Sequence, residues 1–103
     1  MTTRIQQLQD EIARWSDATF GDERPPTRPL HHLAMEVQEL IAEPHDDEEY
    51  ADCLILLLDA YRMAGGNTKQ LLDTAFQKLE INKQRDWGTP DENGVVEHIR
   101  NQP

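Results

Sequence analysis

Hydrophobic residues recur along this chain at intervals of three and four, which is the period of amphipathic α-helices. The first run predicts a helix over about residues 3–18, followed by a loop, residues 20–29, that contains three prolines. A second helix takes Pro29 in its first turn and is expected to end near Glu43-Pro44. The apolar faces consist of Ile5, Leu8, Ile12 and Trp15 in the first helix, and of Leu30, Leu33, Val37, Leu40 and Ile41 in the second.

Two more helices complete the pattern. The third is expected from residue 46 or 47 to Ala64, where two glycines end it. Asn67 with Gln70 three residues later matches a capping box for the fourth, which extends to about residue 86. Its inward-facing residues are expected to be Leu71, Leu72, Ala75, Phe76 and Leu79. The chain is therefore predicted to be all-α, a bundle of four main helices.

The helical pattern fades after Trp87. We expect a short turn at residues 95–99 and a loose end, so that about residues 89–103 form a peripheral tail of a single domain, residues 1–103. Only 37% of the residues are hydrophobic, and they concentrate in residues 51–63. A helix this apolar leaves little surface for water, so we expect a partner subunit to cover it, in a homodimer or homotetramer.

Charge and composition exclude several functions. A net charge of −10 argues against non-specific nucleic-acid binding, which relies on phosphate neutralisation by lysine and arginine. The apolar run is too short to span a bilayer, and the N-terminus does not resemble a signal peptide, so no membrane partner is expected. The single cysteine, Cys53, cannot form an internal disulfide and is interpreted as core packing. These features favour a reducing cytoplasm.

Four carboxylates stand at helical spacing, as Glu36-x-x-Glu39 and Glu49-x-x-Asp52. Residues three apart lie on one face of a helix about one turn apart, so each pair can aim two oxygens at one point. Pro44 lies between the pairs and allows the chain to turn, which would bring the second helix antiparallel to the first. Four acids around one cleft need counter-charge, and hard divalent cations such as Mg²⁺ favour oxygen ligands.

The same acids also have structural interpretations. Acidic pairs at this spacing are common on exposed helices, and Glu49 also fits a capping box and the helix macrodipole. Against this, the first pair lies beside the apolar stripe of its helix rather than opposite to it, together with His32 and Glu43. Asp52 begins a near-continuous apolar helix, where an unpaired acid is costly. The placement therefore favours a metal site, which Glu43 could supplement.

These acids and the blocks around them resemble the all-α nucleoside triphosphate pyrophosphohydrolases, the MazG-like group, and in particular its phage-type dATP/dGTP pyrophosphohydrolase branch. The similarity covers roughly residues 5–88. Its blocks are Trp15 then Phe20-Gly21, His32-Leu33, Glu49-Tyr-Ala-Asp-Cys-Leu-Ile-Leu-Leu-Leu-Asp59, and Lys78-Leu-Glu-Ile-Asn82-Lys-x-Arg85-x-Trp87-Gly88. The broader family often begins the acidic motif with two adjacent acids, whereas the first position here is Met35.

The resemblance implies Mg²⁺- or Mn²⁺-dependent hydrolysis of a nucleoside triphosphate to the monophosphate and pyrophosphate. It assigns two or more ions to Glu36, Glu39, Glu49 and Asp52. Glu39 or Asp52 would orient the attacking water or accept its proton. The implied substrate is a purine nucleotide, (d)GTP ahead of dATP, in a bacterial or phage-infected cytoplasm.

Five residues are candidates for substrate contacts. By resemblance, Lys78, Asn82 and Lys83 would contact phosphate, sugar or base, although basic residues in a last helical turn also complement the helix dipole. Trp15 is placed to stack on a base, but an aromatic residue at helical spacing also fits a core. His32 shares the acidic face and could touch a phosphate or a metal ion.

Several alternatives remain open. An enzyme of the same fold could cleave another nucleotide, such as dATP, dUTP, dCTP or phosphoribosyl-ATP. A non-catalytic acidic helical module that binds a partner is the alternative from a different class. A di-iron carboxylate bundle is disfavoured because it needs Glu-x-x-His pairs, which this sequence lacks. Asp59 either supports the ligand site or pairs with a cation of the fourth helix.

Overall fold

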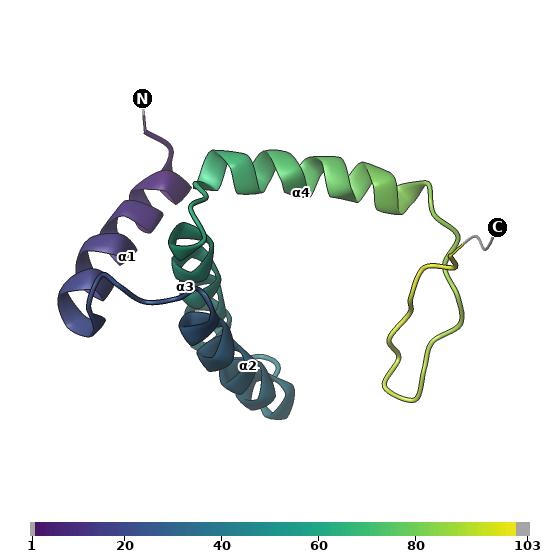
Figure 1. Cartoon of the computed structure of the whole chain (residues 1–103). Coiled ribbons are helices and arrows are strands. Elements are labelled where there is room, and N and C mark those ends of the chain that lie inside the picture. The colour runs from purple at the N-terminus through teal and green to yellow at the C-terminus, as the bar shows by residue number, and fades with distance from the viewer. Residues whose placement is uncertain (1, 101–103) are drawn as a thin grey trace. The chain divides into compact units, whose positions relative to one another are not determined.

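Four α-helices form the secondary structure of this protein in a computed structural model that describes residues 2–100 (Figure 1). They are α1 (Arg4–Phe20), α2 (Thr27–Ala42), α3 (Asp47–Met63) and α4 (Thr68–Lys83). None of residues 2–100 lies in a β-strand, although an isolated bridge joins Trp87 to His98. The prediction of four helices is confirmed, and the ends predicted for the first three agree within about two residues.

The chain divides into two compact units, residues 1–71 and residues 72–103. The first unit contains α1, α2, α3 and the first residues of α4. The second contains the rest of α4 and the C-terminal segment. The expectation of one domain with a peripheral tail stays a prediction.

Local capping chemistry sets where the helices begin. Thr3 accepts a 3.2 Å hydrogen bond from the backbone N–H of Gln6 at the start of α1. Asn67 and Gln70 exchange two 3.0 Å hydrogen bonds between side chain and backbone, which is the capping box predicted for α4. Gly65, with φ of 97°, follows α3 in a conformation that favours glycine. These contacts make the helix ends a property of the local sequence.

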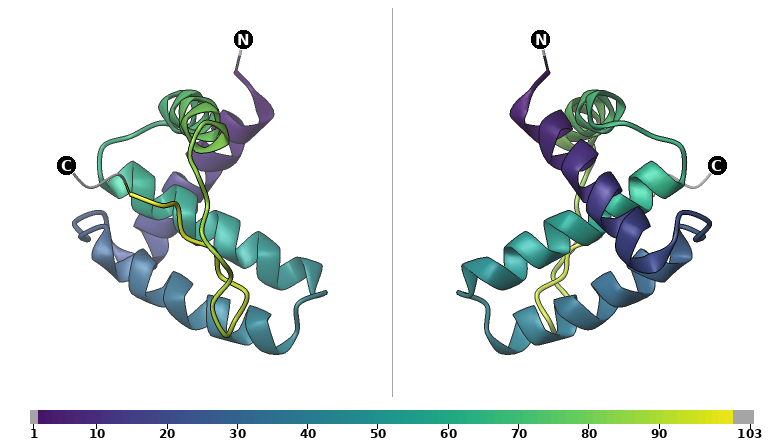
Figure 2. Two further views of the ribbon diagram at one scale, coloured as in Figure 1. Left: turned by 90° about the vertical axis from the view of Figure 1, so that its right-hand side faces the viewer. Right: turned by 90° about the vertical axis from the view of Figure 1, so that its left-hand side faces the viewer.

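The first unit is held together by α3, which packs against both α1 and α2. α2 and α3 run side by side in opposite directions, joined by a short turn (Figure 2). The buried apolar residues are Ile12 of α1 and Leu58 and Ala60 of α3. Gln9 is also buried and donates to the carbonyl of Leu58 at 3.3 Å, which ties α1 to the middle of α3. The antiparallel pair brings the two acidic motifs face to face.

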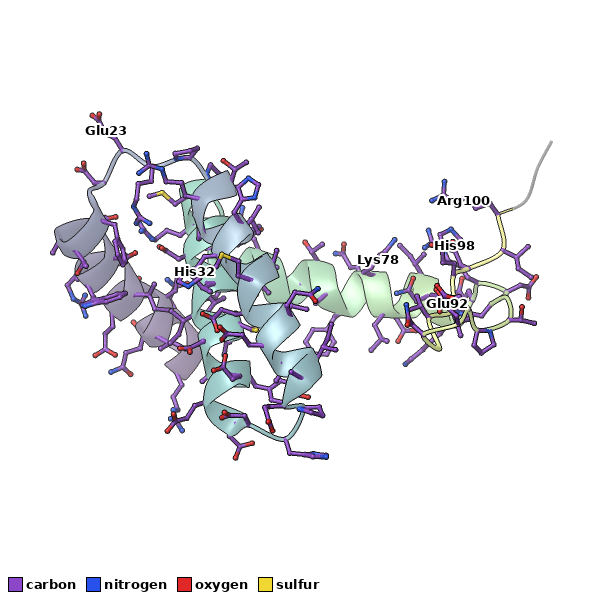
Figure 3. The ribbon with its side chains drawn as sticks, turned by 90° about the horizontal axis from the view of Figure 1, so that it is seen from below. Glu23, His32, Lys78, Glu92, His98 and Arg100 are labelled. Atoms are coloured by element: carbon purple, nitrogen blue, oxygen red, sulfur yellow. The ribbon has the colours of Figure 1, made fainter. Side chains whose placement is uncertain are left out.

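The second unit contains a hairpin between Trp87 and His98, and the loose end that we expected falls partly on residues 101–103, outside the described residues. Gly88 donates to the carbonyl of Glu97 at 2.8 Å, and Asp91 turns the chain by accepting from the backbone N–H of Val95. The turn expected at residues 95–99 is therefore wrong, because these residues form the returning arm. Lys78 projects from α4, while His98 and Arg100 lie on that arm (Figure 3).

α4 ends three residues earlier than predicted, at Lys83. Its last residues tighten into three-residue turns, in which Gln84 and Arg85 donate to carbonyls three positions back. The indole N–H of Trp87 then donates to the carbonyl of Asn82 at 2.9 Å. The helix therefore stops because its last carbonyls find other donors.

Apolar side chains remain exposed on several helices. The apolar face of α4, which we expected to face inward, is exposed at Leu72, Phe76 and Leu79, Phe76 by 71%. Met35 and Ile41 of α2 are each 67% exposed.

Candidate metal centre and adjoining pocket

The turn between α2 and α3 positions the two acidic motifs. Asp46 caps α3 by accepting a 3.0 Å hydrogen bond from the backbone N–H of Glu48. The hydroxyl of Tyr50 donates to the carbonyl of Pro44 at 3.0 Å and holds the connecting segment against the first helical turn of α3. With the turn fixed at both ends, the facing surfaces of α2 and α3 have a defined register.

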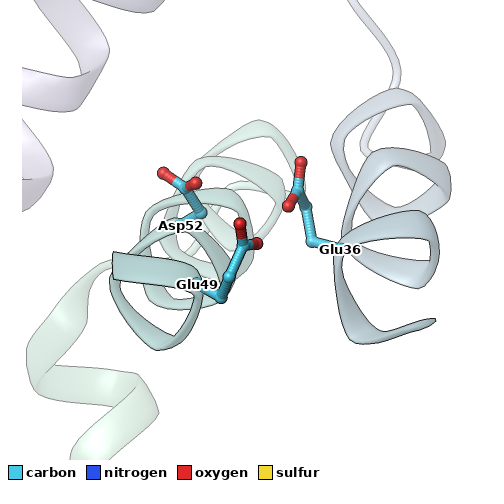
Figure 4. Close-up of side chains that lie close together, drawn as sticks. All are labelled: Glu36, Glu49 and Asp52. Carbon is cyan, nitrogen blue, oxygen red and sulfur yellow. The ribbon is translucent and has the colours of Figure 1, made fainter. Parts of the chain in front are cut away.

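Three carboxylates meet between these helices. Glu36 of α2 and Glu49 and Asp52 of α3 each offer an oxygen, and the three oxygens lie within 4.8 Å of one another (Figure 4). Glu36 and Glu49 are half-buried and Asp52 is exposed. Among residues 2–100, Glu39 stands outside this group of three, although its carboxyl interacts with that of Glu36.

The electrostatics of the cluster show how crowded these acids are. A proton shared with Glu36 raises the pKa of Glu49 to about 7, and burial and the charges of Glu36 and Glu39 act in the same direction. The same hydrogen bond lowers the pKa of Glu36. The pKa of Glu39 is raised, first by its hydrogen bond with Glu36 and then by the charge of that carboxylate. The cluster therefore binds a proton more readily than isolated acids do.

The donor set fits a divalent cation. Glu49 Oε2 is buried and has no hydrogen-bond donor among residues 2–100, so as a carboxylate it is unsatisfied. Either a proton shared with Glu36 or a cation between the carboxylates can satisfy it. All the atoms that converge are carboxylate oxygens, the ligands that Mg²⁺ and Mn²⁺ prefer. Glu36, Glu49 and Asp52 would hold such an ion, with Glu39 beside them.

A pocket of about 410 Å³ adjoins the cluster within the first unit. Glu36 and Asp52 line one end, and Ile55 and Leu56 form an apolar wall in the middle. The other end is bordered by residues of α1, the α1–α2 loop and the start of α2, namely Trp15, Ser16, Phe20, Arg24, Arg28 and Pro29. Because the pocket leads from carboxylates to aromatic rings, it suits an elongated ligand with one charged end and one flat apolar end.

A buried polar network closes the aromatic end. Asp59 accepts from the hydroxyl of Ser16 at 2.7 Å and from Arg24 at 3.3 Å through Oδ2. Through Oδ1 it accepts two hydrogen bonds from Arg62, the shorter at 2.7 Å. Burial opposes ionisation of Asp59, but the bonds from Ser16 and Arg62 outweigh it and lower its pKa. The network fixes the α1–α2 loop to α3.

Two of the predicted substrate residues lie at this pocket. Trp15 lines it and meets Phe20 edge to face, with ring centroids 5.4 Å apart, so the expectation that Trp15 is core is wrong at 58% exposure. His32 lines it as well, and its Nε2 lies 3.1 Å from Glu36 Oε1. Their contacts with a ligand stay predictions.

The other three predicted residues, Lys78, Asn82 and Lys83, belong to the second unit and stay predictions too. Lys83 pairs with Glu80 at 2.9 Å on the exposed side of α4. Burial and the charges of Arg85, Arg100 and Lys78 lower the pKa of His98, so basic groups gather in this unit. Such a group suits phosphate oxygens.

Two further assignments are decided by the structure. The alternative that Asp59 pairs with a cation of α4 is wrong, since its partners are Ser16, Arg24 and Arg62. Cys53 is half-buried, and burial raises the pKa of its thiol, which keeps it protonated and a poor nucleophile.

Sequence reasoning missed three residues that line the pocket, Ser16, Arg24 and Arg28. Arg24 comes from the proline-rich loop and Ser16 from the buried face of α1, and neither belongs to a spaced motif. For Arg28, one signal was available: it precedes His32 by four residues and Glu36 by eight, which places the three on one face of α2.

Known proteins resemble this chain along nearly its whole length. A family model described as dATP/dGTP pyrophosphohydrolase matches residues 8–103. The Eaa protein of Salmonella phage P22 is 42% identical over 98 residues, which are 95% of this chain and 31% of that protein. A dATP/dGTP diphosphohydrolase of cyanophage S-2L is 38% identical over 101 residues, which are 96% of this chain and 91% of that protein. The chain therefore spans about a third of one relative and nearly all of another.

A solved structure has the same fold. The cyanophage S-2L MazG-like pyrophosphohydrolase, bound to dGDP and three catalytic Mn²⁺ ions per active site, superposes with a TM-score of 0.76 at 35% identity. The match covers 95% of this chain and 94% of that chain. The resemblance to the MazG-like group inferred from the acidic motifs is thereby confirmed.

Within residues 2–100, no helix has both the length and the apolar character needed to cross a bilayer.

Proposed function

This chain belongs to the dATP/dGTP pyrophosphohydrolase family, and we propose that it hydrolyses a purine deoxynucleoside triphosphate, dGTP ahead of dATP, to the monophosphate and pyrophosphate. Mg²⁺ or Mn²⁺, two or more per site, would be held by Glu36, Glu39, Glu49 and Asp52. The observation that carries the proposal is the meeting of three carboxylate oxygens within 4.8 Å at one end of a pocket large enough for a nucleoside.

Divalent ions bound there supply charge neutralisation for phosphate oxygens and activation of water. The residues of the chain position these reactants. Glu36, Glu49 and Asp52 aim their oxygens at one point because the short turn holds α2 against α3. Glu39, whose pKa is raised by its hydrogen bond with Glu36 and by the charge of that carboxylate, is the proton acceptor that we propose.

The nucleoside would extend from the carboxylates along the apolar wall toward Trp15 and Phe20. Asp52 and Asp59 lie at opposite ends of the pocket on one helix, about 10 Å apart along its axis, which suits the length of a nucleoside. The exposed rings of Trp15 and Phe20 offer flat apolar surface to a base. His32 would stand beside the phosphates, and Lys78, Asn82 and Lys83 remain the proposed contacts of α4.

We propose that the active form is a homodimer or homotetramer. The apolar side chains exposed on α2 and α4 include Met35, Ile41 and Phe76, each at least 67% exposed. Apolar exposure on this scale in a small chain marks a protein interface. We propose a second copy of the chain as the partner, because the same apolar surface on two copies can pack together in a symmetric interface without a different protein.

The test is a panel of dGTP, dATP, dUTP and dCTP, assayed for pyrophosphate release with Mg²⁺ or Mn²⁺. We expect metal-dependent turnover of the purine nucleotides, and a loss of at least about a hundredfold in Glu39→Gln if this residue accepts the proton. Glu48→Gln, one residue from the cluster on α3, is the matched control and should keep the activity. If no nucleotide is turned over with either metal, the chain acts as a non-catalytic acidic module and the proposal fails.

A further inference from the structure

The aromatic end of the pocket carries hydrogen-bond donors that the proposed function does not use. Arg24 and Arg28 line this end. Arg28 precedes Glu36 by eight residues on α2, which is about 12 Å along the helix axis. Helical side chains lean toward the N-terminus, so Arg28 leans away from the carboxylate cluster. Both arginines therefore belong to the part of the pocket where a base would lie.

The acceptors at this end are already occupied. Asp59 receives two hydrogen bonds from Arg62 on Oδ1, and one each from Ser16 and Arg24 on Oδ2. A carboxylate offers about four acceptor positions, so Asp59 has none left for a ligand. The Ser16 hydroxyl gives its proton to Asp59 and accepts from Arg24 at 3.0 Å. A base that reached this end would meet few open acceptors.

Donors, in contrast, remain available. Arg24 uses three of its five N–H groups, on Gly21, Asp59 and Ser16, and a fourth points toward Asp17 at 3.5 Å. One N–H on Nη1 is left. The side chain of Arg28 is exposed and has no hydrogen bond or ion pair with any residue from 2 to 100; only its backbone N–H donates, to the carbonyl of Pro25. Its guanidinium therefore keeps a complete fork of donors.

We propose that Arg28, assisted by Arg24, makes the pocket selective for guanine over adenine. The inference rests on the proposed function, because it takes the base to lie beside Trp15 and Phe20. Guanine presents two acceptors, O6 and N7, on one edge, and an arginine fork matches that pair. Adenine presents N7 as an acceptor but an N6 amino group as a donor. That amino group would face arginine N–H groups, which are also donors, and no hydrogen bond could form between them. One good contact of this kind discriminates by roughly tenfold or more.

Four triphosphates separate the groups that the pocket could recognise. They are dGTP, dITP, which keeps O6 but lacks the 2-amino group, dATP, and the 2,6-diaminopurine analogue, which keeps the 2-amino group but lacks O6. We expect kcat/KM with Mn²⁺ to be similar for dGTP and dITP, and roughly tenfold or more lower for the two 6-amino nucleotides. If kcat/KM for dITP is as low as that for dATP, the pocket recognises the 2-amino group, and the inference is overturned.

The residue is tested by Arg28→Met, which removes the donors but keeps an aliphatic stem. Because Arg28 is exposed, the substitution should leave the fold intact, as circular dichroism would verify. We expect the ratio of kcat/KM for dGTP to that for dATP to approach one, because kcat/KM for dGTP falls. Arg14→Met, an exposed arginine of α1 that does not line the pocket, is the control and should keep the wild-type ratio.

Failure of the proposed function and failure of this inference give different results. If no triphosphate is hydrolysed, the proposed function fails, and the base preference is then measured by calorimetric binding of dGMP and dAMP. Tighter binding of dGMP to the wild type and equal binding of both to Arg28→Met support the inference. Equal binding to the wild type, or an unchanged preference in Arg28→Met, overturns it.

Discussion

The hydroxyl of Ser16 on α1 donates a 2.7 Å hydrogen bond to Asp59 Oδ2 on α3, and both residues are buried. The same oxygen accepts from Arg24 in the α1–α2 loop. One carboxylate thus fixes two other segments of the chain against α3. Because all three residues line the aromatic end of the pocket, the shape of that end depends on Asp59.

Removing this charge should destabilise the fold. In Asp59→Asn, the buried guanidinium of Arg24 and that of Arg62 lose their shared carboxylate, and we expect a loss of about 3 kcal/mol in the free energy of unfolding. Urea denaturation at neutral pH measures it. Glu80→Gln removes an exposed ion pair with Lys83 and should cost less than about 1 kcal/mol. Equal losses in the two variants would show that the network does not stabilise the fold.

The same network gives a pH dependence of known sign. The pKa of Asp59 is held below its ordinary value of 3.8 by Ser16 and Arg62, despite burial. Its contribution to stability is therefore complete above pH 3.8 and is lost as the pH falls through the lower native value. The difference in the free energy of unfolding between wild type and Asp59→Asn should therefore become smaller at acidic pH. A constant gap down to strongly acidic pH would contradict this assignment.

Metal binding should release protons from the cluster. The pKa of Glu49 is about 7 without metal, so a cation must displace the proton shared with Glu36. We expect the apparent affinity for Mn²⁺ to rise by about tenfold per pH unit below pH 7 and to level off above it. Calorimetric titrations in buffers of different ionisation enthalpy measure the number of protons released. Affinity that does not change between pH 6 and pH 8 would exclude Glu49 as a ligand.

Glu49 should also destabilise the metal-free protein at alkaline pH. Because its native pKa of about 7 exceeds its ordinary value of 4.5, stability falls as the pH rises between these values. Glu49→Gln removes the repulsion between the Glu49 carboxylate and those of Glu36 and Glu39. Its melting temperature in EDTA at pH 8 should therefore be higher than that of the wild type. The increase that Mn²⁺ gives the wild type should be lost. A variant that melts lower in EDTA and still responds to Mn²⁺ would refute both roles.

Oligomerisation is tested by molar mass. The chain has a mass of 11.9 kDa, and light scattering should give two or four times that value. Phe76→Asp places a charge at a side chain that is 71% exposed in the single chain and should lower the measured mass. Gln77→Glu, its neighbour on α4, is the control and should retain the assembly. A wild type that is monomeric at assay concentration would refute the proposed oligomer.

The helices were predictable because their ends depend on neighbours in sequence. The reciprocal bonds of Asn67 and Gln70 and the positive φ of Gly65 follow from residue types alone. The acidic cluster was predictable for the same reason, since three-residue spacing fixes the faces of α2 and α3. Only the short turn at Pro44 was needed to bring those faces together.

The polar network was not predictable, because its members are far apart in sequence. Ser16 and Asp59 are 43 residues apart, and Arg24 and Asp59 are 35 apart. Helical periodicity does not say which distant cation a buried acid meets. Arg62 pairs with Asp59 because it stands three residues away on the same helix, whereas a cation of α4 was one of two alternatives that the sequence left open. Lone arginines such as Arg28 carry no spacing signal strong enough to assign a role.

The central claim is that carboxylates of α2 and α3 hold divalent ions around a bound nucleotide. Its most direct test is a Mn²⁺ titration followed by electron paramagnetic resonance, with an α,β-methylene analogue of dGTP present to prevent turnover. We predict that wild type and Glu48→Gln bind more Mn²⁺ than the analogue alone, and that Glu36→Gln loses this binding. Equal Mn²⁺ binding by Glu36→Gln and wild type, or no binding by the wild type beyond that of the analogue, would contradict the claim.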